Sequence, residues 1–176
     1  INLAKKLIES AARTGVDAVK FQTYLTEKRV SKDSPIYDIL KKCELPFESF
    51  LELKNHCEKF NVEFFSTPFD SESVDYLEKI NVKLYKIASF DIVNTEFLKK
   101  IAKTLKPIII STGMSSLDEI NIAYNILNLN NKNIALLHCV SSYPTKEIDS
   151  NLSVINKLKV SFDCIIGQSD HTNDIQ

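Results

Sequence analysis

The sequence lacks the features that mark membrane proteins and nucleic-acid-binding proteins. Its 176 residues carry 22 basic and 23 acidic side chains, so the formal net charge is −1 and no basic field favours a nucleic acid. No apolar run approaches the roughly 18 residues that a membrane span requires, and no segment resembles a signal peptide. We therefore expect no nucleic-acid partner and no membrane association.

Several familiar ligand-binding patterns are also missing. The four cysteines (Cys43, Cys57, Cys139 and Cys164) form no C-x-x-C pair and have no zinc-finger spacing. Neither a P-loop nor a G-x-G-x-x-G segment occurs, so a nucleotide ligand is not indicated. Cys139 and Cys164 lie in or beside apolar runs, where free thiols behave as small hydrophobic groups. This use of cysteine favours a reducing, cytoplasmic compartment.

What the sequence does contain is an alternation of short β-branched apolar runs with segments of helical periodicity. We predict strands over about residues 18–22, 62–66, 84–88, 107–111, 134–140 and 164–167. We predict helices over about 2–14, 46–60, 71–80, 95–105, 115–127 and 151–158, and residues 36–43 could add a short one. Strands joined by crossover helices run parallel, which indicates an α/β fold.

The predicted architecture is a TIM-type (β/α)8 barrel represented by about six βα units, with the first and last strands missing. A closed barrel of this type typically takes about 250 residues. The chain begins without Met, already inside an amphipathic pattern, and stops a few residues after the sixth predicted strand. Because we find no linker and no low-complexity tract, we predict that residues 1–176 form a single domain.

Each predicted strand ends on polar residues that are useful for chemistry. These ends are Lys20-Phe21-Gln22, Ser66-Thr67-Pro68, Lys86-Ile87-Ala88-Ser89, Ser111-Thr112-Gly113, His138-Cys139-Val140-Ser141-Ser142 and Gln168-Ser169-Asp170-His171. In parallel α/β folds the carboxyl ends of the strands share one face, and ligands bind there. We therefore expect an active site at this face and an enzyme as the protein.

Two lysines lie inside predicted strands. Lys86 stands between Tyr85 and Ile87, and Lys20 occupies a similar place in the first strand. Such a lysine pairs with an anion or has a depressed pKa, unless its side chain extends from the strand end to solvent. Lys86 and Lys20 could therefore each bind an anion or act as a Schiff-base nucleophile. Two lysines directed at one mouth favour a doubly charged ligand, such as a phosphate or a carboxylate.

Small hydroxyl groups accompany these lysines, at Thr67, Ser89, Ser111, Thr112, Ser141 and Ser169. Each by itself is typical of a helix N-cap or a turn, but together with backbone N–H groups they could cradle a phosphate. The segment Ser111-Thr112-Gly113-Met114 is the best candidate, because Gly113 allows close approach of the backbone.

The carboxylates and histidines near these ends have competing interpretations. Asp91 is a candidate carboxylate at the mouth or a helix N-cap, although Asn94 is better placed to cap, and Asp70 is expected to cap the helix that begins at Ser71. His56 is expected on an exposed helix face, and His138 is either a satisfied core residue or part of a site. His171, after the last strand, is open to metal ligation or to acid–base work.

Taken in order, the strand ends resemble the sialic acid synthase family, which comprises N-acetylneuraminate, pseudaminate and legionaminate synthases. The likeness covers essentially the whole chain. It rests on Asp17-Ala18-Val19-Lys20-Phe21-Gln22, Phe65-Ser66-Thr67-Pro68-Phe69-Asp70, Tyr85-Lys86-Ile87-Ala88-Ser89, Ser111-Thr112-Gly113-Met114, Leu137-His138-Cys139, Ser142-Tyr143-Pro144-Thr145 and Ser169-Asp170-His171-Thr172.

The resemblance implies a transferase that condenses phosphoenolpyruvate with an open-chain N-acetylated amino sugar, giving a nine-carbon 2-keto sugar acid and phosphate. A divalent metal, Mn²⁺ or Mg²⁺, would polarise the sugar aldehyde, with His171 as one ligand. Gln22 and Tyr143 would face the sugar, and Asp91, which replaces the usual glutamate of the family, would be catalytic together with Lys86. Phosphoenolpyruvate would be bound by Lys20, Thr67, Lys86, Ser89, Ser111, Ser141 and Ser169.

Three features of the resembled family are expected outside residues 1–176. They are a second metal-binding histidine, a glutamate on the first strand, and a carboxy-terminal antifreeze-like domain that lends an arginine to the partner subunit of a homodimer. We therefore expect residues 1–176 alone to be inactive or nearly so. The acceptor stays open, because Ser89-Phe90-Asp91 leans towards the pseudaminate type and residues 65–70 also suit the legionaminate type.

Two other functions stay open at this point. One is a Schiff-base aldolase or lyase on a TIM barrel, with Lys86 or Lys20 as the nucleophile. The other is a non-catalytic barrel fragment that binds an anionic metabolite or a partner chain. Borohydride trapping separates the aldolase from the synthase, since the synthase forms no imine.

Overall fold

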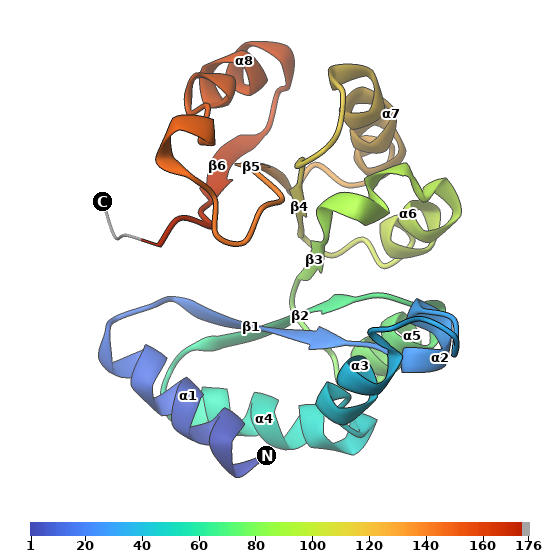
Figure 1. Ribbon diagram of the computed structural model, residues 1–176, viewed down its shortest axis with the longest axis vertical. Helices are drawn as coiled ribbons and strands as arrows, with labels where there is room; N and C mark the ends of the chain where they lie inside the picture. The colour runs from blue at the N-terminus through green and yellow to red at the C-terminus, as the bar shows by residue number, and fades with distance from the viewer. Residues whose placement is uncertain (174–176) are drawn as a thin grey trace. The chain divides into compact units, whose positions relative to one another are not determined.

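The computed structural model describes residues 1–173 and divides the chain into two compact units (Figure 1). The first unit is Ile1–Tyr85, and the second begins at Lys86. The six strands follow chain order in one sheet, β1-β2-β3-β4-β5-β6, and the β1–β2, β2–β3, β4–β5 and β5–β6 pairs are parallel. This sequential parallel order confirms the predicted α/β fold of a partial TIM-type barrel.

The first unit contains two long paired strands and five helices. The strands are β1 (Ala18–Thr23) and β2 (Glu63–Pro68), which pair along their whole length. The helices are α1 (Asn2–Arg13), α2 (Thr26–Arg29), α3 (Tyr37–Cys43), α4 (Phe47–Lys59) and α5 (Ser71–Lys79). Helix α4 buries Phe50, Leu53 and Cys57, the apolar stripe that its periodicity indicates.

The helix ends in this unit depend on residues in the left-handed backbone region. Gly15, just after α1, has φ +80°, as expected for a helix C-terminus. Asn61 and Asn81 have φ values of 55° and 53° after α4 and α5, where glycine is the commoner choice. After each asparagine, the N–H of the next valine reaches back to the last helical turn, at 3.2 Å in both cases.

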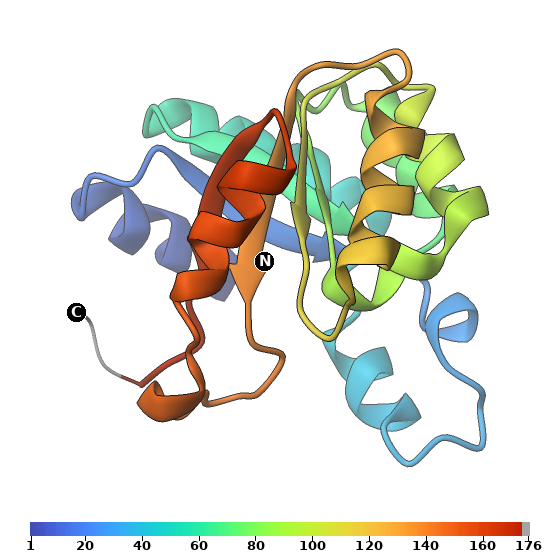
Figure 2. The same ribbon diagram turned by 90° about the horizontal axis from the view of Figure 1, so that it is seen from above.

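The second unit repeats the βα alternation with shorter strands. Its strands are β3 (Tyr85–Ile87), whose first residue belongs to the first unit, β4 (Ile108–Ser111), β5 (Ile134–Cys139) and β6 (Ile165–Ser169). Its helices are η1 (Ser89–Val93), α6 (Thr95–Ala102), α7 (Leu117–Asn128), η2 (Glu147–Asp149) and α8 (Ser153–Ser161). Helices α6 and α7 lie side by side (Figure 2).

Side-chain caps fix several helix starts, and those at Asp70 and Asn94 are the ones the sequence predicts. Asp70 caps α5 by accepting from the N–H of Ser73 at 2.7 Å, and Asn94 caps α6. Ser116 and Glu119 form a reciprocal capping box at the start of α7. Asp70 starts α5 three residues after the end of β2, which keeps the polar end of that strand close to a helix N-terminus.

The structure differs from the sequence prediction at four places. The short helices α2, η1 and η2 lie after β1, β3 and β5, where only loops were expected. His56 is half-buried rather than exposed, because its Nε2 lies 3.1 Å from Glu9 of α1 and its ring packs against Phe60.

Among the described residues, no helix combines the length and apolar character needed to cross a bilayer.

The single-domain prediction can be tested with one core variant in each unit. Leu53 and Leu98 are both fully buried, one in α4 and one in α6. Replacing either by alanine should destabilise by about 2–5 kcal/mol. If residues 1–176 are one domain, each protein unfolds in a single thermal transition whose calorimetric and van't Hoff enthalpies agree. Both variants should then lower the midpoint temperature of that one transition. Two transitions, each shifted by only one of the variants, would show two independent domains.

Candidate active site

Lys86 is buried in β3, with only 8% of its surface exposed. Its Nζ donates to Ser111 Oγ at 2.6 Å and to the carbonyl oxygen of Ile87 at 2.8 Å. Ser111 is the last residue of β4, so this hydrogen bond joins two strands at the predicted ligand-binding face. The alternative in which Lys86 extends to solvent is therefore wrong.

A cradle of four residues lies around the loop after β4. We call Ser89, Gly113, Cys139 and Ser141 the serine cradle. The N–H of Gly113 donates to Ser89 Oγ at 3.1 Å, and the same oxygen lies 3.1 Å from Cys139 Sγ. A Cβ on Gly113 would collide with Ser141 Oγ and lie 2.8 Å from Cys139 Sγ. Packing against Ser141 and Cys139 therefore requires a residue without a Cβ at Gly113, while the approach of a phosphate to this backbone stays a prediction.

Thr112 has a different role from the one its hydroxyl suggested. Its backbone N–H and its Oγ1 both donate to the carbonyl oxygen of Leu137, at 3.0 and 3.1 Å. Both groups therefore continue the pairing of β4 with β5 beyond Ser111. We attribute a structural role to Thr112, while Ser111 keeps its place beside Lys86.

His171 is held by the loop that follows β5. Its Nδ1 lies 2.7 Å from the carbonyl oxygen of Val140, so this nitrogen carries the proton and donates it. The lone pair is then on Nε2, which is 3.3 Å from Ser169 Oγ. The ring of Tyr143 stacks on the imidazole with a centroid distance of 4.1 Å.

This tautomer suits a metal ligand, because ligating histidines usually donate their second N–H to a carbonyl or a carboxylate. However, no group of three His, Cys, Asp or Glu side chains within residues 1–173 is arranged to hold a metal ion. The described residues thus fit one ligand position, at His171 Nε2, and do not form a complete coordination sphere.

His138 and Asp91 are both buried, and the structure resolves their competing interpretations. His138 Nε2 lies 2.7 Å from the carbonyl oxygen of Ser150, so His138 is a core histidine with a satisfied hydrogen bond. Asp91 lies in η1 and is not the cap of α6, because Asn94 accepts from the N–H of Phe97 at 3.2 Å. Asp91 is thus a buried carboxylate two residues after Ser89 of the serine cradle.

In the first unit, Lys20, Gln22 and Thr67 share one face of the β1–β2 pair. Lys20 is opposite Phe65 and Gln22 is opposite Thr67, and side chains two residues apart point to the same face. Lys20 is exposed to solvent, yet desolvation by the surrounding protein atoms lowers its pKa. Lys20 and Lys86 belong to different units, and their convergence on one ligand stays a prediction.

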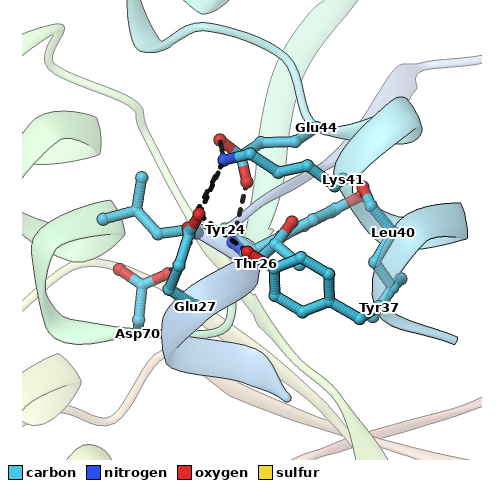
Figure 3. A network of polar contacts seen from close by, with 9 residues as sticks. Tyr24, Thr26, Glu27, Tyr37, Leu40, Lys41, Glu44 and Asp70 are labelled. Atoms are coloured by element: carbon cyan, nitrogen blue, oxygen red, sulfur yellow. Dashed lines mark hydrogen bonds and ion pairs between the residues drawn. The ribbon is translucent and has the colours of Figure 1, made fainter. Parts of the chain in front are cut away.

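Carboxylates hold the long segment between β1 and α4 in place (Figure 3). Glu44 accepts from the N–H of Thr26 at 2.7 Å, and Lys41 Nζ lies 2.9 Å from Glu44 and 3.0 Å from Glu27. The Tyr37 hydroxyl also donates to Glu27 at 3.0 Å. Within residues 23–44 the sequence indicated only a possible short helix over 36–43, which α3 bears out, and this network was not predicted from it.

Asp70, which lies just after β2, also binds the segment between β1 and α4. Asp70 Oδ2 accepts from the N–H of Leu25 at 2.8 Å, while Oδ1 caps α5. The predicted N-cap role of Asp70 is confirmed, but its bond to Leu25, 45 residues away in the chain, has no local signal in the sequence.

Replacing Gly113 by alanine should destabilise the protein, because the new Cβ would collide with Ser141 Oγ. Overpacking of this kind costs about 1–3 kcal/mol. Urea unfolding should show a lower midpoint with an unchanged slope. Adding Ser141→Ala removes the colliding oxygen and should restore part of the loss. A Gly113→Ala variant as stable as the wild type would contradict this packing.

Replacing Lys41 by methionine should raise the pKa of Glu27. The backbone N–H of Glu27, then Lys41 and Tyr37, lower this pKa from 4.5 to about 2. A depressed folded pKa stabilises the protein above the unfolded pKa, and that contribution is lost as pH falls from 4.5 to about 2. NMR titration of the Glu27 carboxyl should show a higher pKa in Lys41→Met. The exposed neighbour Lys42 serves as the control. An equal shift of the Glu27 pKa in Lys42→Met would refute the assignment to Lys41.

Comparison with known proteins identifies relatives along the whole chain. The family model described as NeuB family matches residues 7–176. An uncharacterised protein of Methanocaldococcus jannaschii is 48% identical over 173 residues, which cover 98% of this chain and 51% of that protein. The N,N'-diacetyllegionaminic acid synthase of Campylobacter jejuni is 43% identical, over 99% of this chain and 58% of its own length. The chain spans about half the length of the curated relatives it matches.

A solved structure repeats the same fold with little change. The N-acetylneuraminic acid synthetase of Leptospira borgpetersenii, crystallised with citrate, aligns with a TM-score of 0.96 and 40% identity. The alignment covers 99% of this chain and 61% of that protein. Together with the family match over residues 7–176, these likenesses show that the chain belongs to the NeuB family.

Proposed function

We propose that the complete protein carrying residues 1–176 condenses phosphoenolpyruvate with an N-acetylated amino sugar, to give a nonulosonic acid and phosphate. The observation that carries this proposal is the buried ammonium of Lys86 beside Ser111 at the carboxyl end of β4. Relatives named as legionaminic and pseudaminic acid synthases support the same reaction class.

In this proposal, the second unit binds the anionic groups of phosphoenolpyruvate. Lys86 supplies a positive charge, and Ser111, Ser89, Ser141 and Ser169 supply hydroxyl donors at the ends of neighbouring strands. Hydrogen bonds from a cation to a phosphate or carboxylate oxygen are about twice as strong as neutral ones. Lys20 and Thr67 of the first unit would add a second charge and a further hydroxyl.

The same proposal assigns chemistry to the remaining residues. As carbon 3 of phosphoenolpyruvate bonds to the sugar aldehyde carbon, the C=O π bond breaks and the aldehyde oxygen takes up a proton to become a hydroxyl. Water adds at carbon 2, and the buried Asp91 carboxylate would accept one of its protons. The bond from carbon 2 to the phosphate oxygen then breaks as the 2-keto group forms, so that one water proton ends on the new hydroxyl and the other on phosphate. A divalent metal, Mn²⁺ or Mg²⁺, would supply Lewis acidity at the aldehyde oxygen, and His171 Nε2 would hold it. Gln22 and Tyr143 would contact the sugar.

The arrangement around Lys86 favours an anion binder over a Schiff-base nucleophile. Its Nζ engages two oxygen acceptors, Ser111 Oγ and the carbonyl oxygen of Ile87, through N–H groups. An imine would have to give up at least one of these two bonds, because its nitrogen keeps at most one N–H. We therefore place the aldolase second.

Four further expectations belong to this proposal. The complete protein acts as a homodimer in the cytoplasm, it needs the divalent metal, and residues 1–176 alone turn over little or no substrate. The acceptor is N-acetylmannosamine or a diacetamido-trideoxyhexose of the legionaminate or pseudaminate type.

An assay of the complete protein tests the proposal directly. With phosphoenolpyruvate, a divalent metal and each candidate sugar in turn, one sugar should give phosphate and 2-keto acid in equal amounts, and chelation should stop turnover. Lys86→Met should lower kcat/KM for phosphoenolpyruvate by about 10- to 100-fold, the worth of one charged hydrogen bond. Lys83→Met, which removes an exposed lysine paired with Glu63, is the matched control.

Two results would overturn the proposal. One is the absence of phosphate release with every acceptor. The other is a borohydride-trapped substrate adduct on Lys86, which would make the protein a Schiff-base enzyme. Steady phosphate release by residues 1–176 alone would refute the expectation that they are inactive.

A further inference from the structure

Arg29 lies over two aromatic rings next to the polar ends of β1 and β2. Its guanidinium carbon is 3.9 Å from the ring centroid of Phe69 and 4.8 Å from that of Tyr24. The two rings meet edge to face, with centroids 6.2 Å apart. We call Arg29, Tyr24 and Phe69 the arginine cap. Arginine is rare here, since Arg13 and Arg29 are the two arginines among 22 basic residues.

The arginine cap continues the face that carries the first unit's predicted site residues. On that face Lys20 is level with Phe65, and Gln22 is level with Thr67. Two residues further along each strand come Tyr24 and Phe69, about 7 Å beyond Gln22 at about 3.3 Å per residue. The strand pairing extends to this level, because the N–H of Phe69 donates to the carbonyl oxygen of Thr23 at 3.1 Å.

Hydrogen bonds from three directions fix the cap in place. The Tyr24 hydroxyl donates to the carbonyl oxygen of Leu40 at 2.9 Å. The N–H of Leu25 binds Asp70, and the N–H of Thr26 binds Glu44 at the start of α2, the helix that ends at Arg29 (Figure 3). These bonds hold the Tyr24 side chain and the backbone at the start of α2, so the segment that carries Arg29 loses little further conformational entropy when a ligand binds.

The guanidinium carbon lies over both rings, whose planes are inclined at 73° to each other. A guanidinium is planar and carries five N–H donors, which can engage oxygen acceptors while its carbon packs against an aromatic ring. Hydroxyl and acetamido oxygens of a sugar accept such bonds, and aromatic rings pack against the apolar faces of sugars. Along the strands, Lys20 lies deepest and the arginine cap lies nearest the carboxyl ends. Two ligands could therefore bind at different depths, one beside Lys20 and one beside Arg29.

We propose that Arg29 is a specificity-determining residue that donates to an oxygen of the acceptor sugar, while Lys20 serves the phosphoenolpyruvate side of the same site. This inference rests on the proposed function. It assigns to Arg29 a preference among N-acetylated sugars, and it assigns to Tyr24 and Phe69 the positioning of the guanidinium.

The test compares Arg29→Met with Lys28→Met in the complete protein. Methionine keeps a long apolar side chain against the rings but removes the charge and the donors. Arg29→Met should raise KM for the acceptor sugar about tenfold or more, leave KM for phosphoenolpyruvate within about twofold, and change the ranking of kcat/KM among candidate sugars. Lys28, on the same short helix, is exposed and paired with Glu72 at 3.2 Å, so Lys28→Met should leave all three constants unchanged.

A binding measurement separates failure of this inference from failure of the proposed function. Saturation-transfer NMR with N-acetylmannosamine and with a diacetamido sugar reports sugar binding whether or not product forms. An unchanged acceptor KM and unchanged sugar binding in Arg29→Met would overturn the role of Arg29, as would a larger effect on phosphoenolpyruvate. If Arg29→Met does not fold, Arg29→Lys, which keeps the charge but loses the planar donors, must show the same selective loss.

Discussion

The buried ammonium of Lys86 is the constraint on which the second unit's strand ends depend. A charged group with 8% exposure needs acceptors within hydrogen-bond distance, and Ser111 and the Ile87 carbonyl provide them. Ser111 is therefore held against β3 at the point where β4 ends. The chain then turns at Gly113, whose backbone N–H reaches Ser89. Removing Lys86 would take away the hydrogen bond that holds Ser111 against β3.

In the first unit, the long polar segment after β1 is held in one conformation. Carboxylates do this, because Glu44 and Asp70 each accept from a backbone N–H at the start of that segment. The same bonds fix the short helix α2 and with it Arg29. The long polar segment after β1 is thus fixed by specific hydrogen bonds, next to the face that carries Lys20, Gln22 and Thr67.

Sequence reasoning predicted the features that depend on local physics. Apolar periodicity located all six strands and the longer helices within a few residues, and the capping residues Asp70 and Asn94 act as expected. The need for a small residue at Gly113 was also visible, because the position lies between a strand end and a helix start.

Features that depend on distant parts of the chain could not be predicted. His56 is half-buried because α1 brings Glu9 against it, 47 residues away. Cys139 looked like a simple core thiol, and only the packing of three strand ends places it beside Ser89. Thr112 resembled the neighbouring site hydroxyls, yet strand pairing directs it to Leu137. Asn61 and Asn81 end helices in a conformation for which glycine is the usual signal.

The central claim is that two amines, one from each unit, bind the same doubly negative ligand. The most direct measurement is a crystal structure of the complete protein with phosphoenolpyruvate. We predict that the Nζ atoms of Lys20 and Lys86 both lie about 3 Å from phosphate or carboxylate oxygens of the one ligand, with Ser111 in contact beside them. A ligand bound away from the strand ends, or contacted by only one of the two amines or by neither, would contradict this proposal.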